Sequence, residues 1–276
     1  ARPQIGVPTH IDVVPVGEGW THPPFSGAVA EGFIWGRGAQ DDKGPLIAAL
    51  YGLYALKRAG FRPPVTYRII IGTQEEIGDW SDLREYLDQQ GAPDFGFTPD
   101  ASFPLITGEK GMVNATFEAA WGAETVAAES VEFISLRGGS RPNIVPDLCE
   151  LTLRYTAARR AEITRELMDN ATRFVMEHPE ARITIFPEKA RSIPGGAEEL
   201  VISFLGKPAH GSTPEKGHNA ILDALQFFAL QSAFPARARR FAGFLAWATA
   251  ALDGENLGIR SSHDFVGHTT VNLGVA

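Results

Sequence analysis

The sequence predicts an α/β domain with a mostly parallel sheet, followed by an α+β domain. Over residues 1–111, apolar strand-like segments alternate with helix-like segments, which is typical of strands joined by helical crossovers. From residue 112 onward, groups of strand-like segments precede helix-like ones, an order typical of α+β domains. We therefore expect two domains, residues 1–111 and residues 112–276.

The first domain is expected to hold strands and helices in alternation. Strands are expected at residues 5–14, 65–72 and 95–97, and helices at residues 42–60 and 81–90. Asp42 can cap the first of these helices, Pro45 suits its first turn, and Gly60 suits its end.

The second domain is expected to hold more strands than helices. The strand-like segments with partial alternation are 112–120, 131–137, 148–156, 182–186 and 199–205. The amphipathic helix-like segments are 161–177 and 219–234. Proline and glycine between residues 187 and 196 mark a loop inside this domain.

Composition narrows the classes of function. Hydrophobic residues make up 44% of the 276 residues, enough for a buried core, and the net charge of −8 disfavours nucleic acid or an anionic membrane as a partner. The sequence contains no run of about 18 uncharged apolar residues, so it does not predict a membrane span. Cys149 is the only cysteine, which excludes an internal disulfide and fits a reducing, cytoplasmic location. Residues 1–15 lack the pattern of a signal peptide.

A histidine and several carboxylates follow the predicted strands of the first domain. Ligands of open α/β sheets bind at the carboxyl ends of strands, so these side chains are expected to converge. One imidazole with several carboxylates suits zinc, and a carboxylate can bridge two ions about 3.5–4 Å apart. The residues are His10, Asp12, Asp41, Glu75, Glu76 and Asp100.

Each of these pieces has an ordinary interpretation when taken alone. A His-x-Asp sequence in a strand is usually incidental, and an Asp-Asp-Lys-Gly stretch is more often a solvated turn. A Glu-Glu pair is usually on the surface, and Asp100 after Pro99 is normally a turn residue. The joint placement of the pieces after successive strands is what predicts a metal site.

Six ordered motifs resemble the zinc dipeptidase, carnosinase and aminoacylase family, which also includes desuccinylases and carboxypeptidases. The branch that the sequence resembles most is that of the PepV-type dipeptidases. The motifs are THIDVVP (9–15), WGRGAQDDKGP (35–45), GTQEEIG (72–78), TPDASFP (98–104), EKGMV (109–113) and AHGSTPEKGHNA (209–220).

The resemblance implies a metal centre with two zinc ions, with cobalt or manganese as alternatives. His10 and Asp100 would bind one ion, Asp41 would bridge both, and Glu76 would bind the second. It also implies that residues 1–111 are the N-terminal part of a catalytic domain and that residues 112–276 are an incomplete lid domain.

The resemblance also implies catalytic and substrate-binding roles. Asp12 would orient and polarise His10, and Glu75 would be the general base that takes a proton from a water bridging the two ions. In the lid, Asn143 and His210 match residues that contact substrate and polarise the scissile carbonyl.

The sequence departs from the family pattern at both ends. The family closes its second zinc site with a histidine from a C-terminal segment that rejoins the catalytic domain, and no such segment is found. His268 lies in strand-like sequence instead. A segment before the first strand is also missing, so we expect the chain to be truncated relative to the family.

The expected function is metal-dependent hydrolysis of the amide bond of dipeptides. A deacylase of N-acyl amino acids or a carboxypeptidase of the same family is an alternative, and a noncatalytic homologue or fragment is another. The expected partner is a small peptide substrate, with a homodimer through the lid as a further alternative.

Overall fold

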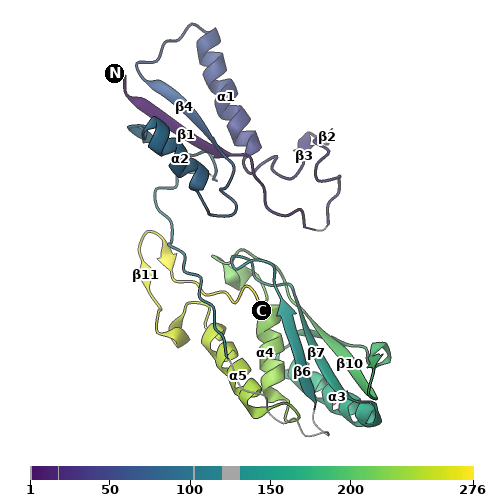
Figure 1. The fold of residues 1–276 in the computed structure, drawn as a ribbon. Helices are drawn as coiled ribbons and strands as arrows, with labels where there is room; N and C mark the ends of the chain where they lie inside the picture. The colour runs from purple at the N-terminus through teal and green to yellow at the C-terminus, as the bar shows by residue number, and fades with distance from the viewer. Residues whose placement is uncertain (1, 18, 102, 120–130) are drawn as a thin grey trace. The chain divides into compact units, whose positions relative to one another are not determined.

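The computed structural model describes residues 2–17, 19–101, 103–119 and 131–276 (Figure 1). The chain divides into two compact units, Ala1–Thr107 and Gly108–Ala276, and each is described by itself. Among the described helices, none combines the length and the apolar character that crossing a membrane requires.

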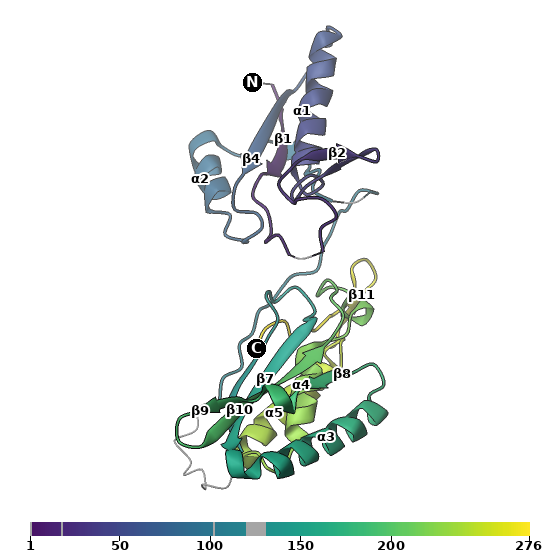
Figure 2. The ribbon, with the colours of Figure 1, turned by 90° about the vertical axis from the view of Figure 1, so that its right-hand side faces the viewer.

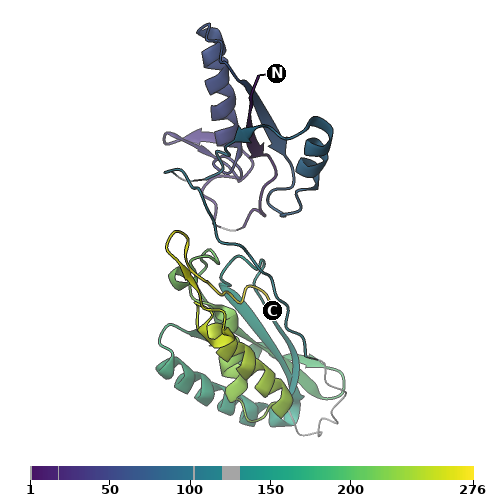
Figure 3. The same cartoon turned by 90° about the vertical axis from the view of Figure 1, so that its left-hand side faces the viewer.

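The first unit is built on a three-stranded parallel sheet with the strand order β4-β1-β5. Helices α1 and α2 lie on opposite faces of this sheet (Figures 2 and 3). Strands β2 and β3 form a separate antiparallel hairpin, which the sequence did not predict. The elements are β1 (Gln4–His10), β2 (Ala28–Ala30), β3 (Phe33–Trp35), α1 (Lys43–Arg58), β4 (Thr66–Gly72), α2 (Ser81–Gln90) and β5 (Phe95–Gly96). The predicted parallel sheet is confirmed.

The register of the sheet sets where its strands end. Strand β1 pairs with β4 from Gln4 opposite Thr66 to His10 opposite Gly72, so both strands finish at the same edge. The predicted strand 5–14 is therefore too long, because β4 offers no ladder partner beyond Gly72. Strand β5 approaches β1 closely, since a Cβ at residue 96 would lie 2.5 Å from the carbonyl oxygen of Gly6 and only glycine fits.

The second unit is an antiparallel sheet with helices packed against it. Its elements are β6 (Glu132–Gly138), β7 (Leu148–Thr156), α3 (Arg160–Glu177), β8 (Arg182–Ile185), β9 (Arg191–Ile193), β10 (Ala197–Leu205), α4 (Ala220–Leu230), α5 (Ala236–Ala250), β11 (Ser262–His263) and β12 (Gly267–His268). The strand order is β6-β7-β10-β8, with β9 pairing with β10 and a separate β11-β12 hairpin. Short 3₁₀ turns lie at Ala157–Arg159, Pro187–Lys189, Pro214–Lys216 and Glu255–Leu257.

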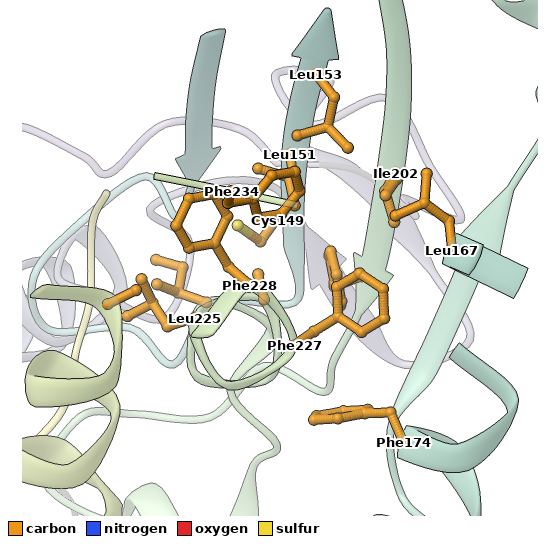
Figure 4. Close-up of a cluster of buried hydrophobic side chains, with 14 of the residues drawn as sticks. Cys149, Leu151, Leu153, Leu167, Phe174, Ile202, Leu225, Phe227, Phe228 and Phe234 are labelled. Atoms are coloured by element: carbon orange, nitrogen blue, oxygen red, sulfur yellow. The ribbon is translucent and has the colours of Figure 1, made fainter. Parts of the chain in front are cut away.

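The core of the second unit lies between one face of the sheet and helices α3 and α4 (Figure 4). Strand β7 alternates buried and more exposed residues, so Leu151 and Leu153 point to the same side. They meet Ile202 of β10, Phe174 of α3 and Phe227 of α4, all nearly inaccessible to solvent. This packing confirms the α+β arrangement that the strand and helix pattern predicts.

Two expected elements of the second unit differ in the structure. The predicted helix 219–234 ends at Leu230, because Gln231 takes an extended backbone with ψ at 107°, and a separate helix α5 starts after Pro235. The predicted strand 112–120 is wrong for residues 112–119, which are irregular; residue 120 lies outside the described residues. Apolar alternation alone does not form a strand when no neighbouring strand pairs with it.

Candidate metal centre

Three parts of the first unit bring one imidazole and two carboxylates together. His10 is the last residue of β1 and only 2% exposed, Asp41 lies just before α1, and Asp100 follows β5. His10 Nε2 is 2.9 Å from Asp41 Oδ1 and 3.4 Å from Asp100 Oδ2. One ligand atom from each of the three residues lies within 4.8 Å of the others. These three candidate ligands form one group that can hold a metal ion.

Asp12 contacts the second ring nitrogen of His10, Nδ1. His10 Nδ1 lies 3.1 Å from the backbone oxygen of Asp12, which only accepts, so Nδ1 carries the proton in this contact and Nε2 faces the carboxylates. The Asp12 carboxylate also accepts the backbone N–H of Glu76 at 2.9 Å and that of Glu75 at 3.4 Å. One aspartate therefore connects the ring of His10 to the turn that carries both glutamates.

The two glutamates have different surroundings. Glu75 Oε2 lies 3.9 Å from His10 Nε2, beside the three-residue group. Glu76 Oε1 accepts the backbone N–H of Val14 at 3.2 Å and is not a member of that group. The expected metal ligands His10, Asp41 and Asp100 are thus brought together, while Glu76 stands in the neighbouring turn.

Crowding and burial make the cluster bind protons more tightly than separate side chains would. Burial together with the nearby Asp41 carboxylate raises the pKa of Asp100 to about 6. Burial also raises the pKa of Glu75. Burial alone would lower the pKa of His10, but Asp100, the Asp12 carbonyl, Glu75 and Asp41 together raise it. A divalent cation would relieve this repulsion by displacing protons from the site.

Asn143 and His210 lie side by side in the second unit. Ile144 forms an isolated bridge with His210, and the N–H of Gly211 donates to the carbonyl oxygen of Asn143 at 2.7 Å. His210 Nδ1 accepts the backbone N–H of Ser212 at 3.2 Å, so the proton of the neutral ring is on Nε2. The pair thus presents an amide and a ring N–H, both of which can donate.

The comparisons agree with the motifs. The family model described as Peptidase family M20/M25/M40 matches residues 6–252. The chain belongs to this family. The resemblance drawn from the motifs is confirmed.

Relatives of this M20 chain carry dipeptidase names. A Staphylococcus haemolyticus protein named "Putative dipeptidase SH1171" is 34% identical over 272 residues, which are 98% of this chain and 55% of that protein. The Beta-Ala-Xaa dipeptidase of Lactobacillus delbrueckii subsp. lactis is 33% identical over 266 residues, 96% of this chain and 52% of that protein. The chain thus spans about half the length of the curated relatives it matches.

A solved structure in the comparisons is the crystal structure of human carnosine dipeptidase 1. It is 15% identical and has a TM-score of 0.34, covering 74% of this chain and 54% of that one.

Asp42 of this M20 chain contacts the candidate metal centre, and the sequence did not predict this contact. It occupies the cap position of α1, but its side chain makes no capping bond there. Its Oδ2 instead accepts the backbone N–H of His10 at 3.1 Å. The carboxylate is fully buried, and its Oδ1 has no hydrogen-bond partner among the described residues. The sequence shows only a second aspartate at a helix start, which is why a cap was expected.

Strand geometry explains why this N–H needs a carboxylate. The N–H of Ile11 donates to Gly72 of β4, so the N–H of His10 points to the opposite side of β1. On that side β5 pairs only with Ile5 and Gly6 and offers no carbonyl oxygen to His10. Asp42 takes the place of the missing strand partner. Two consecutive aspartates therefore contact His10. Asp41 contacts its ring, and Asp42 accepts its backbone N–H.

We expect Asp42→Ala to lower zinc affinity by about 10- to 100-fold, because His10 loses the acceptor of its backbone N–H. Asp42→Asn keeps an acceptor oxygen and should stay within a few-fold of the unchanged protein. Competition titration with a chelator measures both. Leu46→Ala, which removes a buried side chain of the same helix, is the control: it should lower Tm without weakening zinc. Equal zinc affinity in Asp42→Ala and the unchanged protein would contradict this account.

Zinc affinity should also fall in acid. Below about pH 6 a proton occupies Asp100, and His10, whose pKa is raised, holds its proton as well. Both protons must leave when a metal binds, so affinity should drop on the order of 10-fold or more from pH 7 to pH 5. Titration at several pH values, corrected for the chelator's own protonation, checks this. A flat profile would show that these groups are not the ligands.

Proposed function

We propose that this chain carries the metal centre of a zinc-dependent dipeptidase that hydrolyses the amide bond of dipeptides. The observation that carries the proposal is the convergence of His10, Asp41 and Asp100, with ligand atoms within 4.8 Å of one another, beside the Glu75 carboxylate. A relative named Beta-Ala-Xaa dipeptidase supports dipeptides as the class of substrate.

The donor set of the site fits zinc. One imidazole nitrogen and carboxylate oxygens are ligands that zinc accepts, and cobalt or manganese can use the same set. His10, Asp41 and Asp100 would hold one ion. The side chain of Asp41 is 64% exposed, which leaves it free to bridge to a second ion that Glu76 would bind. When bound, zinc lowers the pKa of water to about 7 and polarises a carbonyl group.

Glu75 would serve as the general base. Its carboxylate lies next to the three-residue group, and burial raises its pKa, which makes it a better proton acceptor. It would take the proton of the attacking water and pass that proton to the leaving amine. Asp12 supports this role because it holds both the Glu75 backbone and the ring of His10.

Asn143 and His210 would bind the substrate. The Asn143 amide and the Nε2–H of His210 are neutral donors, suited to a carbonyl oxygen that gains negative charge as water adds. A homodimer through the second unit and a cytoplasmic location remain predictions from the sequence.

A substrate panel tests the reaction class. Zinc-loaded protein should hydrolyse free dipeptides and lose that activity when a chelator removes the metal. Cleavage of N-acyl amino acids without cleavage of dipeptides would instead indicate a deacylase, and zinc binding without any hydrolysis would indicate a noncatalytic chain.

Glu75→Gln should leave zinc bound and lower turnover on the order of 100-fold or more, because the amide cannot accept a proton at neutral pH. The readouts are metal content and dipeptide hydrolysis measured on the same sample. Glu85→Gln is the matched control, since Glu85 lies on α2 and contacts Gln89 at the surface. Near-normal turnover of zinc-loaded Glu75→Gln would move the base role to another residue.

A further inference from the structure

The backbone around Asp41 decides where this candidate ligand lies. Among the described residues, the Asp41 carboxylate has one hydrogen bond, to His10 Nε2 at 2.9 Å, and its side chain is 64% exposed. Asp41 belongs to a short loop, residues 38–43, in which the N–H of Lys43 donates to the carbonyl oxygen of Gly38 at 3.1 Å. Asp42 and helix α1 hold one end of this loop. The position of Asp41 therefore depends on what holds the other end.

Arg37 holds that other end. Its backbone N–H donates to the carbonyl oxygen of Pro24 at 2.7 Å. Its guanidinium Nη2 donates to the carbonyl oxygen of Val16 at 2.9 Å. Val16 belongs to the irregular segment 13–16, which follows the strand β1 and Asp12 in the chain. Arg37 thus connects the loop of Asp41 to the segment that continues from the histidine strand.

Trp20 fixes the guanidinium of Arg37. The indole Nε1–H of Trp20 donates to the same carbonyl oxygen of Val16, at 2.8 Å. The guanidinium carbon of Arg37 lies 5.1 Å from the centre of the Trp20 ring, a distance at which the ring face attracts a cation. Two donors that also contact each other therefore converge on one carbonyl oxygen.

The loop of Asp41 also packs directly against segment 13–16. Gly38 has a φ of +82°, and a Cβ at this position would lie 2.7 Å from Val13 Cγ1. Only glycine fits here, because both the conformation and the contact exclude a side chain. The loop therefore has no room to shift toward the segment, and Arg37 opposes a shift away from it.

Segment 13–16 is in turn connected to the rest of the metal centre. The backbone oxygen of Asp12, just before the segment, lies 3.1 Å from Nδ1 of His10. The N–H of Val14 donates to Glu76 Oε1 at 3.2 Å. A loop that is held against this segment is held in place relative to the histidine and the glutamate turn as well.

We propose that Arg37 is a positioning residue of the metal centre, which keeps the loop of Asp41 at the distance from His10 at which both side chains bind one ion. The inference rests on the metal centre of the proposed function and deepens it, because it names a residue that acts on the site through a ligand. Without the Arg37 side chain the loop loses its bond to Val16, and the Asp41 carboxylate moves with the loop.

Arg37→Ala should lower zinc affinity about 10-fold or more, as expected when a group behind a metal ligand is removed. Arg37→Lys is the conservative variant, because lysine keeps a cation over Trp20 and a donor for Val16. It also lacks the Nε–H of Arg37, which is buried without an acceptor among the described residues. Arg37→Lys should therefore stay within a few-fold of the unchanged protein. Competition titration with a chelator measures both affinities.

Arg68→Ala is the matched control for a loss of stability alone. The guanidinium carbon of Arg68 lies 5.2 Å from the centre of the Tyr86 ring, and its Nη1 donates to Gln4 Oε1 at 2.7 Å, so its contacts are of the same kinds. Arg68 pairs opposite Gly6, away from the end of β1 that carries His10. Arg68→Ala should lower Tm and leave zinc affinity unchanged. Equal losses of zinc affinity in the two alanine variants would overturn the inference.

Cobalt provides a readout that a general loss of stability does not change. When cobalt replaces zinc, its visible spectrum reports the number and arrangement of the ligands. The spectrum of Arg37→Ala should shift, because the Asp41 carboxylate leaves its place, whereas Arg68→Ala should give the spectrum of the unchanged protein. An unchanged zinc affinity or an unchanged cobalt spectrum in Arg37→Ala would overturn the inference.

Trp20→Ala decides the question if Arg37→Ala does not fold. It removes the ring beside the guanidinium and the second donor to Val16, from a partly buried position in an irregular segment. Folded as judged by its Tm, Trp20→Ala should bind zinc several-fold more weakly, and the affinity of the unchanged protein in this variant would contradict the inference. Failure of the proposed function looks different: the unchanged, zinc-loaded protein would hydrolyse no dipeptide, whereas the zinc affinities would still differ as stated.

Discussion

The parallel pairing of β1 with β4 is the constraint on which the candidate metal centre depends. Its register places His10 opposite Gly72, so the chain leaves both strands at one edge of the sheet. The turn with Glu75 and Glu76 then follows β4 at the edge where β1 presents its histidine. A shift of one residue would turn His10 to the other face and remove it from the carboxylates. Register therefore decides the chemistry available at this edge.

The cluster shows how a reactive site is maintained against its own electrostatics. Burial disfavours charge on Asp100 and Glu75, and the neighbouring carboxylates repel one another. The same carboxylates raise the pKa of His10. The fold holds these groups by bonds to the backbone, from Asp42 to His10 and from Asp12 to the glutamate turn. Groups held this way stay positioned for a cation without rearranging, which is the usual basis of tight metal binding.

The second unit is held together mainly by the burial of apolar side chains. Its antiparallel sheet buries one face under α3 and α4, and β6 stands at one end of the strand order. Apolar side chains of β6, α4 and α5 line a cavity of about 870 Å³ in this unit, and Asn143 and His210 belong to the same lining.

The sequence by itself determined the elements with strong local patterns and predicted that three of its candidate ligands lie together. The strands that became β1, β4 and β7, the helices α1 and α3, and the convergence of His10, Asp41 and Asp100 all follow from periodicity and from placement after strands. Only the tertiary structure decided that residues 112–119 stay irregular, that Asp42 bonds His10 instead of capping α1, and that a cavity adjoins Asn143. The physical reason is range: periodicity reports which face of a segment is apolar, whereas a ladder partner, a buried acceptor and the lining of a cavity depend on segments far apart in the chain.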